Sequence, residues 1–137
     1  SLTVGWANVA DANRTNYLIL ANTTGTFTDP TNGNAPPADD LDLSDGSGAI
    51  SLGAAATSQA WSTGLSASTV YHFKIYARNS AGNLYLTAAA PSASRTTLAA
   101  VPTQQPSGLS LSAISDTQIN GSFTAPGSPP TSYIVLR

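Results

Sequence analysis

The stretch VYHFKIYARN, residues 70–79, has the most regular alternation in the chain and predicts a β-strand that is buried on one side. Its first apolar position is followed by apolar or small residues at every second place, which predicts that these side chains face a core: Tyr71, Phe73, Ile75 and Ala77. The intervening side chains are expected to face away from that core: His72, Lys74, Tyr76 and Arg78.

The rest of the chain has the same β character. SLTVGW, residues 1–6, alternates in the same way, and Gly, Pro, Asn and Asp gather in turn-like segments such as 28–37 and 125–130. No stretch has a convincing helical period, and LGAAATSQA, residues 52–60, is interpreted as a loop or an edge strand. Several short strands separated by turns predict an all-β, antiparallel β-sandwich.

Composition limits the functions that can be considered. The chain has 137 residues, 41% of them hydrophobic and only 9% charged, with a formal charge of -2, so it can bury one sizeable core and has no basic surface for nucleic acid. It contains no cysteine, which excludes disulfides and thiolate chemistry, and no apolar run long enough to span a membrane. A polar but weakly charged β-protein of this kind is typical of extracellular or cell-surface proteins, and this is the localisation we expect.

The segment LSASTVYHFKIYARNSAGN, residues 65–83, resembles the turn before the sixth strand, and that strand itself, of a fibronectin type III domain. Leu65, Thr69 and Tyr71 occupy the positions of the family pattern, whereas Ala67 and Ser68 stand where proline and glycine would be expected. By the same resemblance, residues 2–6, 16–20 and 91–99 correspond to the second, third and last strands. The resemblance implies an immunoglobulin-like sandwich with these core residues: Trp6, Tyr17, Leu65, Tyr71, Phe73, Ile75, Phe123 and Tyr133.

The chain also repeats itself. TNYLIL at residues 15–20 returns as TSYIVLR at 131–137, which aligns Tyr17 with Tyr133 and Trp6 with Phe123 at a period of about 116 residues. PSGLSLSAISD, residues 106–116, resembles a first strand that residues 1–100 lack. We therefore expect a first domain over 1–100 with an insertion at about 22–60, a linker over 101–106, and a partial second domain over 107–137 that supplies the first three strands.

Three features are candidate sites, and each has a structural alternative. His72, Lys74, Tyr76 and Arg78 form a basic and aromatic row that could contact a glycan or a protein, or simply fill a sheet face. Asp40, Asp42 and Asp45 cluster near glycine and are weak calcium candidates, but they fail the EF-hand spacing and equally suit a solvated turn. Residues 17–20 are apolar on both faces, so either the insertion or a partner chain is expected to cover the outer face.

No catalytic motif or cofactor site is predicted, and we expect no enzymatic activity. The resemblance implies a structural or adhesive stalk module of a large tandem-repeat protein on a bacterial surface or secreted from it, in contact with neighbouring repeats. An accessory spacer or carbohydrate-binding module of a secreted polysaccharide-degrading enzyme is the alternative. A subunit of an extracellular filament, assembled by adding a strand to another copy, is the third possibility.

Overall fold

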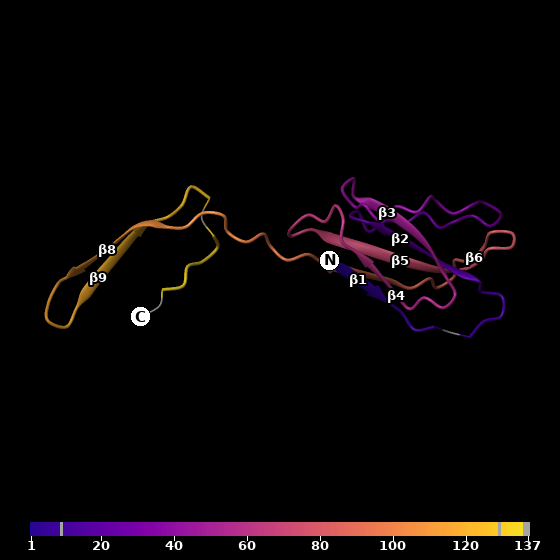
Figure 1. Cartoon of the computed structure of the whole chain (residues 1–137), viewed down its shortest axis with the longest axis horizontal. Helices are drawn as coiled ribbons and strands as arrows, with labels where there is room; N and C mark the ends of the chain where they lie inside the picture. Colours follow the sequence, from indigo (N-terminus) through magenta and orange to yellow (C-terminus); the bar gives the residue numbers. More distant parts are fainter. Residues whose placement is uncertain (9, 129, 136–137) are drawn as a thin grey trace. The chain divides into compact units, whose positions relative to one another are not determined.

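The computed structural model describes residues 1–8, 10–128 and 130–135, and the chain divides into two compact units, Ser1–Ala99 and Ala100–Arg137 (Figure 1). Every regular element among these residues is a β-strand, and all strand pairs are antiparallel. The prediction of an all-β, antiparallel protein is confirmed. Nowhere in the described chain is there a helix with the length and apolar character needed to cross a membrane.

Unit 1, Ser1–Ala99, consists of two antiparallel sheets, as a β-sandwich requires. The smaller sheet pairs β1 (Leu2–Gly5) with β4 (Ser58–Trp61). The larger sheet has the order β3 (Ser47–Gly53), β2 (Asn16–Asn22), β5 (Val70–Asn79), and the far edge of β5 is shared by β6 (Leu84–Leu86) and β7 (Ser92–Thr96). The bounds of β5 are those predicted from the sequence for the strand over residues 70–79.

The core of unit 1 lies between the two sheets and contains these buried side chains: Tyr17, Ile19, Ala21, Leu43, Ile50, Trp61, Tyr71, Phe73 and Ile75. Four of the residues expected in the core, Tyr17, Tyr71, Phe73 and Ile75, are buried there, and Leu65 is partly buried against them. The central tryptophan is Trp61, which is 0% exposed and has its ring 5.7 Å from that of Phe73.

Trp6 lies at the margin of this core. Its side chain is only partly buried, and its ring meets the ring of Tyr17 edge-on at 5.4 Å. Among the described residues β1 pairs with β4 alone, so Trp6 follows a strand that has no neighbour on its other side. Trp6, expected in the core, packs against it as a partly buried side chain, and the fully buried tryptophan is Trp61.

The corner before β5 is fixed by Tyr71. Its hydroxyl accepts a hydrogen bond from the backbone N–H of Ser66 at 2.9 Å and donates to the carbonyl of Gly64 at 3.4 Å. The phenol ring is 1% exposed, so the buried side chain holds the preceding turn against the sandwich by its polar end.

The outer face of the larger sheet carries a second, smaller core made of Leu18, Tyr76 and Tyr85. The long loop between β2 and β3, residues 23–46, covers it. Within that loop the Asn32 side chain accepts from the backbone N–H of Tyr85 at 2.7 Å, and the Asn34 carbonyl accepts from the Tyr85 hydroxyl at 2.9 Å. The insertion covers the outer face of β2, which is one of the two possibilities that the sequence leaves open.

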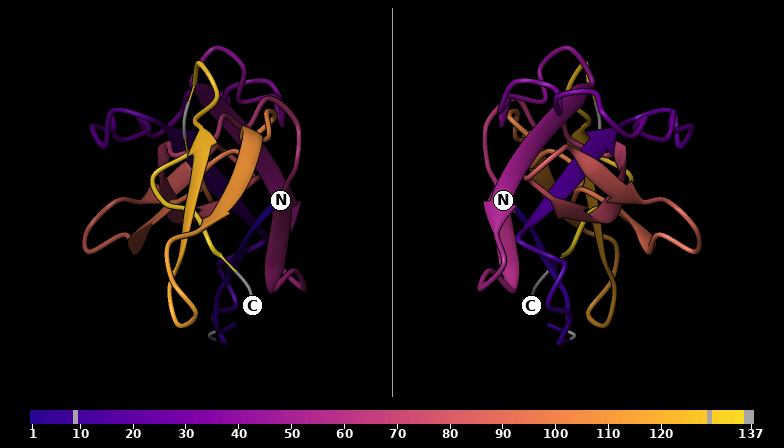
Figure 2. Two further views of the ribbon diagram at one scale, coloured as in Figure 1. Left: turned by 90° about the vertical axis from the view of Figure 1, so that its left-hand side faces the viewer. Right: turned by 90° about the vertical axis from the view of Figure 1, so that its right-hand side faces the viewer.

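Unit 2, Ala100–Arg137, contains one hairpin, formed by β8 (Ser107–Ala113) and β9 (Ile119–Thr124) (Figure 2). All residues of both strands are exposed, and Phe123, expected in a core, is 41% exposed against a partly buried Tyr133. Residues 131–135 form no strand, and Leu136 and Arg137 lie outside the described residues. Apart from β8 and β9, the described part of unit 2 has no strand beside which residues 131–135 could pair.

Candidate functional site

The row of side chains on the outer face of β5 is not the exposed stripe that the alternation suggests. Tyr76 is 0% exposed, and His72, Lys74 and Arg78 are partly buried. Tyr76 points away from the main core, as the alternation predicts, but the 23–46 loop and Tyr85 cover this face of the sheet. The row is therefore a second packing surface over much of its length.

Asp29 ties this loop to β5. One of its carboxylate oxygens accepts from the Lys74 ammonium at 2.7 Å and from the Tyr76 hydroxyl at 2.8 Å. The hydrogen bonds from Lys74 and then Tyr76 lower the pKa of Asp29 below 3.8, and the bond to Asp29 raises the pKa of Lys74 above 10.5. Burial, and then the bond to Asp29, raises the pKa of Tyr76 above 10.0. All three shifts favour the neutral phenol and the ion pair that hold the loop down.

The two ends of the row have packing partners as well. The His72 ring lies against Gly25, where an added Cβ would come within 3.0 Å of it and where φ is +75°, so glycine is required. Arg78 donates to the side chain of Asn83, and its guanidinium carbon lies 5.9 Å from the centre of the Tyr85 ring. Each of the four predicted binding residues therefore contacts the protein's own loops.

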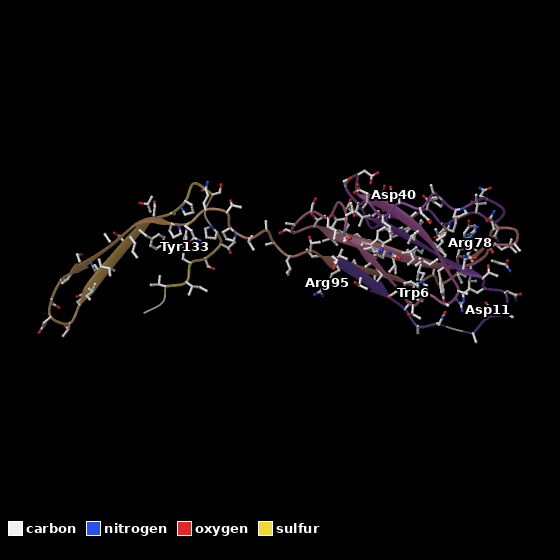
Figure 3. The ribbon with its side chains drawn as sticks, in the orientation of Figure 1. Trp6, Asp11, Asp40, Arg78, Arg95 and Tyr133 are labelled. Carbon is white, nitrogen blue, oxygen red and sulfur yellow. The ribbon has the colours of Figure 1, made fainter. Side chains whose placement is uncertain are left out.

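The three candidate calcium ligands act as turn residues. The carboxylates of Asp40, Asp42 and Asp45 each accept from the backbone N–H two residues later, at 2.9 Å in every case. No group of three acidic, histidine or cysteine side chains suited to a metal occurs within the described ranges. Figure 3 shows Asp40 on the β3 side of unit 1, away from Trp6 and Asp11.

Unit 1 has an apolar groove beside β1, which we call the β1 groove. One bank is formed by residues 4–7 and the other by residues 91–93, and the floor consists of the core side chains Ile19, Phe73 and Ile75. It has a volume of about 450 Å³. A second hollow of about 280 Å³ continues it past Trp6 and Pro91 toward Leu86. Sequence reasoning anticipated an unpaired edge here through the missing first strand, but not the groove.

Comparisons of the chain with protein-family models, with curated proteins and with solved structures find no match. We therefore infer function from the fold, the internal repeat and the open groove.

Proposed function

We propose that the chain is part of a tandem array of fibronectin type III-like modules in an extracellular or cell-surface protein, and that it acts as a structural or adhesive stalk without catalysis of its own. The observation that carries this proposal is the repeat. The aligned pairs Trp6–Tyr17 and Phe123–Tyr133 both stack edge-on, with ring centres 5.4 Å and 4.8 Å apart and interplanar angles of 69° and 65°. The similar packing of the aligned aromatic pairs supports the interpretation of the two segments as copies of one motif.

The module type is supported by the two-sheet architecture and by one tyrosine. The β1–β4 sheet and the sheet that contains β3, β2, β5 and β7 enclose one core, which is the two-sheet architecture shared by immunoglobulin and fibronectin type III domains. In such sandwiches a tyrosine near the start of the sixth strand bonds the backbone a few residues upstream. Tyr71 does so through Ser66 and Gly64.

The positions of the ends support an end-to-end array. Figure 1 shows the N-terminus, at the start of β1, at the same end of unit 1 as the point where the chain leaves after β7. A first strand antiparallel to β1 would begin at the opposite end. The two termini of a complete module would then lie at opposite ends. The length of an array of such modules grows with their number.

Glycan binding by the β5 row is less well supported than the stalk role. A sugar-binding surface needs an accessible aromatic face with free polar groups beside it, whereas Tyr76 is 0% exposed and Lys74 is paired with Asp29. These groups attach the covering loop, which is a structural task.

The stalk role can be tested by small-angle X-ray scattering of arrays with increasing copy number. Each module would place residues 107–118 in front of residues 2–106, because the repeat aligns Ile119 with Leu2. We expect the maximum dimension of proteins with two, four and six modules to rise in proportion to copy number. Growth with the cube root of copy number, as in a compact particle, would contradict the proposal.

A further inference from the structure

The edge of β1 that faces the β1 groove carries unpaired backbone groups. The N–H of Trp6 donates to the carbonyl of Thr57 at 3.0 Å, so Trp6 and Thr57 are a hydrogen-bonded pair of the β1–β4 ladder. Bonded pairs alternate along antiparallel strands. Val4 and Leu2 therefore also bond to β4, while the N–H and C=O groups of Thr3 and Gly5 point to the open side.

In unit 2, β8 pairs with β9, the strand that the repeat aligns with β1. The repeat aligns β9 with β1, so that Thr3 corresponds to Asn120 and Gly5 to Ser122. The N–H of Ile114 donates to the Gln118 carbonyl at 2.8 Å, and the alternation that starts from this pair makes Ser112–Asn120 and Ser110–Ser122 hydrogen-bonded pairs.

Thus β9 bonds β8 through the same backbone groups that β1 leaves free. Transferred to β1, this register sets Ser112 opposite Thr3 and Ser110 opposite Gly5. It also sets Leu111 opposite Val4, in the way that Leu111 now lies opposite Gly121.

The side chains of β8 suit the β1 groove. Directly opposite residues on paired strands share a face. Leu111 would therefore lie on the same side as Val4, which packs against the core. The register of β8 shifts between Ser107 and Ser110, so the alternation is not extended to Leu109. In unit 2 the Leu111 side chain is 70% exposed, so it buries little where it is. The β8 segment carries no charge that would have to be desolvated in the groove.

Exchange of β8 between partners is energetically inexpensive. An isolated two-stranded hairpin is marginally stable in water, and every residue of β8 and β9 is exposed. Moving β8 from β9 to the edge of β1 replaces one antiparallel ladder by another of the same register. It also transfers the Leu111 side chain from water to an apolar groove.

We propose that the β1 groove binds strand 107–113 of a second copy of this chain, antiparallel to β1 and in the position that the first strand of a complete module would take, with Leu111 inserted between residues 4–7 and 91–93. The contact is heterologous, since the donor strand of one copy meets the acceptor edge of another, and it can link copies in series.

The first test compares two variants of the full chain that add the same charge at adjacent positions. Leu111→Asp places a carboxylate in the groove, whereas Ser112→Asp places it on the opposite face of the strand. Analytical ultracentrifugation should show self-association that rises with concentration in wild type and Ser112→Asp and is lost in Leu111→Asp. Hydrogen exchange at Thr3 and Gly5 should slow at least tenfold with concentration only where association occurs.

The second test uses Leu111→Asp, whose own donor strand is disabled while its acceptor edge is intact, with a synthetic peptide of residues 106–116. Binding of the peptide should slow exchange at the same two amides. A wild-type chain that stays monomeric at millimolar concentration would overturn the proposal, as would association that survives in Leu111→Asp or edge amides protected in a dilute monomer. None of these results would bear on the stalk role, which scattering tests separately.

Discussion

The hydroxyl of Tyr71 provides a sharp test of how the corner before β5 is held. Tyr71→Phe keeps the buried ring and removes only the acceptor of the 2.9 Å bond from Ser66 and the donor of the 3.4 Å bond to Gly64. The longer bond contributes little, and Ser66 is exposed enough for water to replace part of the shorter one. We therefore expect a loss of about 1 kcal/mol in the free energy of unfolding.

For a domain the size of unit 1 this corresponds to a fall of about 4–8 °C in Tm. Tryptophan fluorescence is the natural assay because both tryptophans, Trp6 and Trp61, belong to unit 1. Tyr17→Phe is the matched control, since the Tyr17 hydroxyl donates to the side chain of the exposed Asn8, which water can satisfy. A Tm for Tyr71→Phe that equals that of wild type, or a larger fall for Tyr17→Phe, would refute this reasoning.

Three further outcomes are expected. Trp61→Ala should cost about 3–5 kcal/mol in urea unfolding, and Trp6→Ala less than half as much, because only the first ring is fully buried; equal costs would contradict the assignment of the core. Asp29 has a lowered pKa, so its contribution to stability is present above pH 3.8 and is lost as the pH falls through the pKa of the folded state. Asp29→Asn should therefore reduce the fall in Tm at acid pH, and an unchanged fall would contradict the role of the Asp29 carboxylate. Lys74 has a raised pKa, so its contribution to stability is present below pH 10.5 and is lost as the pH rises through the pKa of the folded state. EDTA should leave the melting curve unchanged, and a fall in Tm would assign Asp42 and its neighbours to a metal.

Local alternation predicted strands well where one face of the strand meets the main core. Residues 70–79 form one strand with the predicted bounds, and Tyr71, Phe73 and Ile75 face the core as expected. The pattern is reliable here because the period of two is a property of the backbone and does not depend on the rest of the fold. The apolar outer face of residues 17–20 likewise predicted a cover, and the 23–46 loop supplies one.

Alternation could not predict what lies above the other face. Tyr76 points away from the main core as predicted, yet it is 0% exposed because Tyr85 and the 23–46 loop fold over it. Nor could alternation predict which of the two tryptophans is the more deeply buried. Trp6 lies in the clearer strand pattern but at an open edge, while Trp61 ends a four-residue strand and reaches the centre of the sandwich. Both outcomes depend on tertiary neighbours rather than on local sequence.

The two apolar surfaces of unit 1 pose the same physical problem. The outer face of β2 is covered within the chain because the loop that leaves this strand is long enough to return over it, and Asp29 anchors the loop to Lys74 and Tyr76. The groove beside β1 has no such loop among the described residues, and its edge lacks hydrogen-bond partners as well as apolar ones. A loop side chain can fill a hollow, but only an extended segment can also pair with Thr3 and Gly5. The occupant of the groove is therefore expected to be a strand with an apolar side chain that faces the core, and β8 supplies Leu111 for this position.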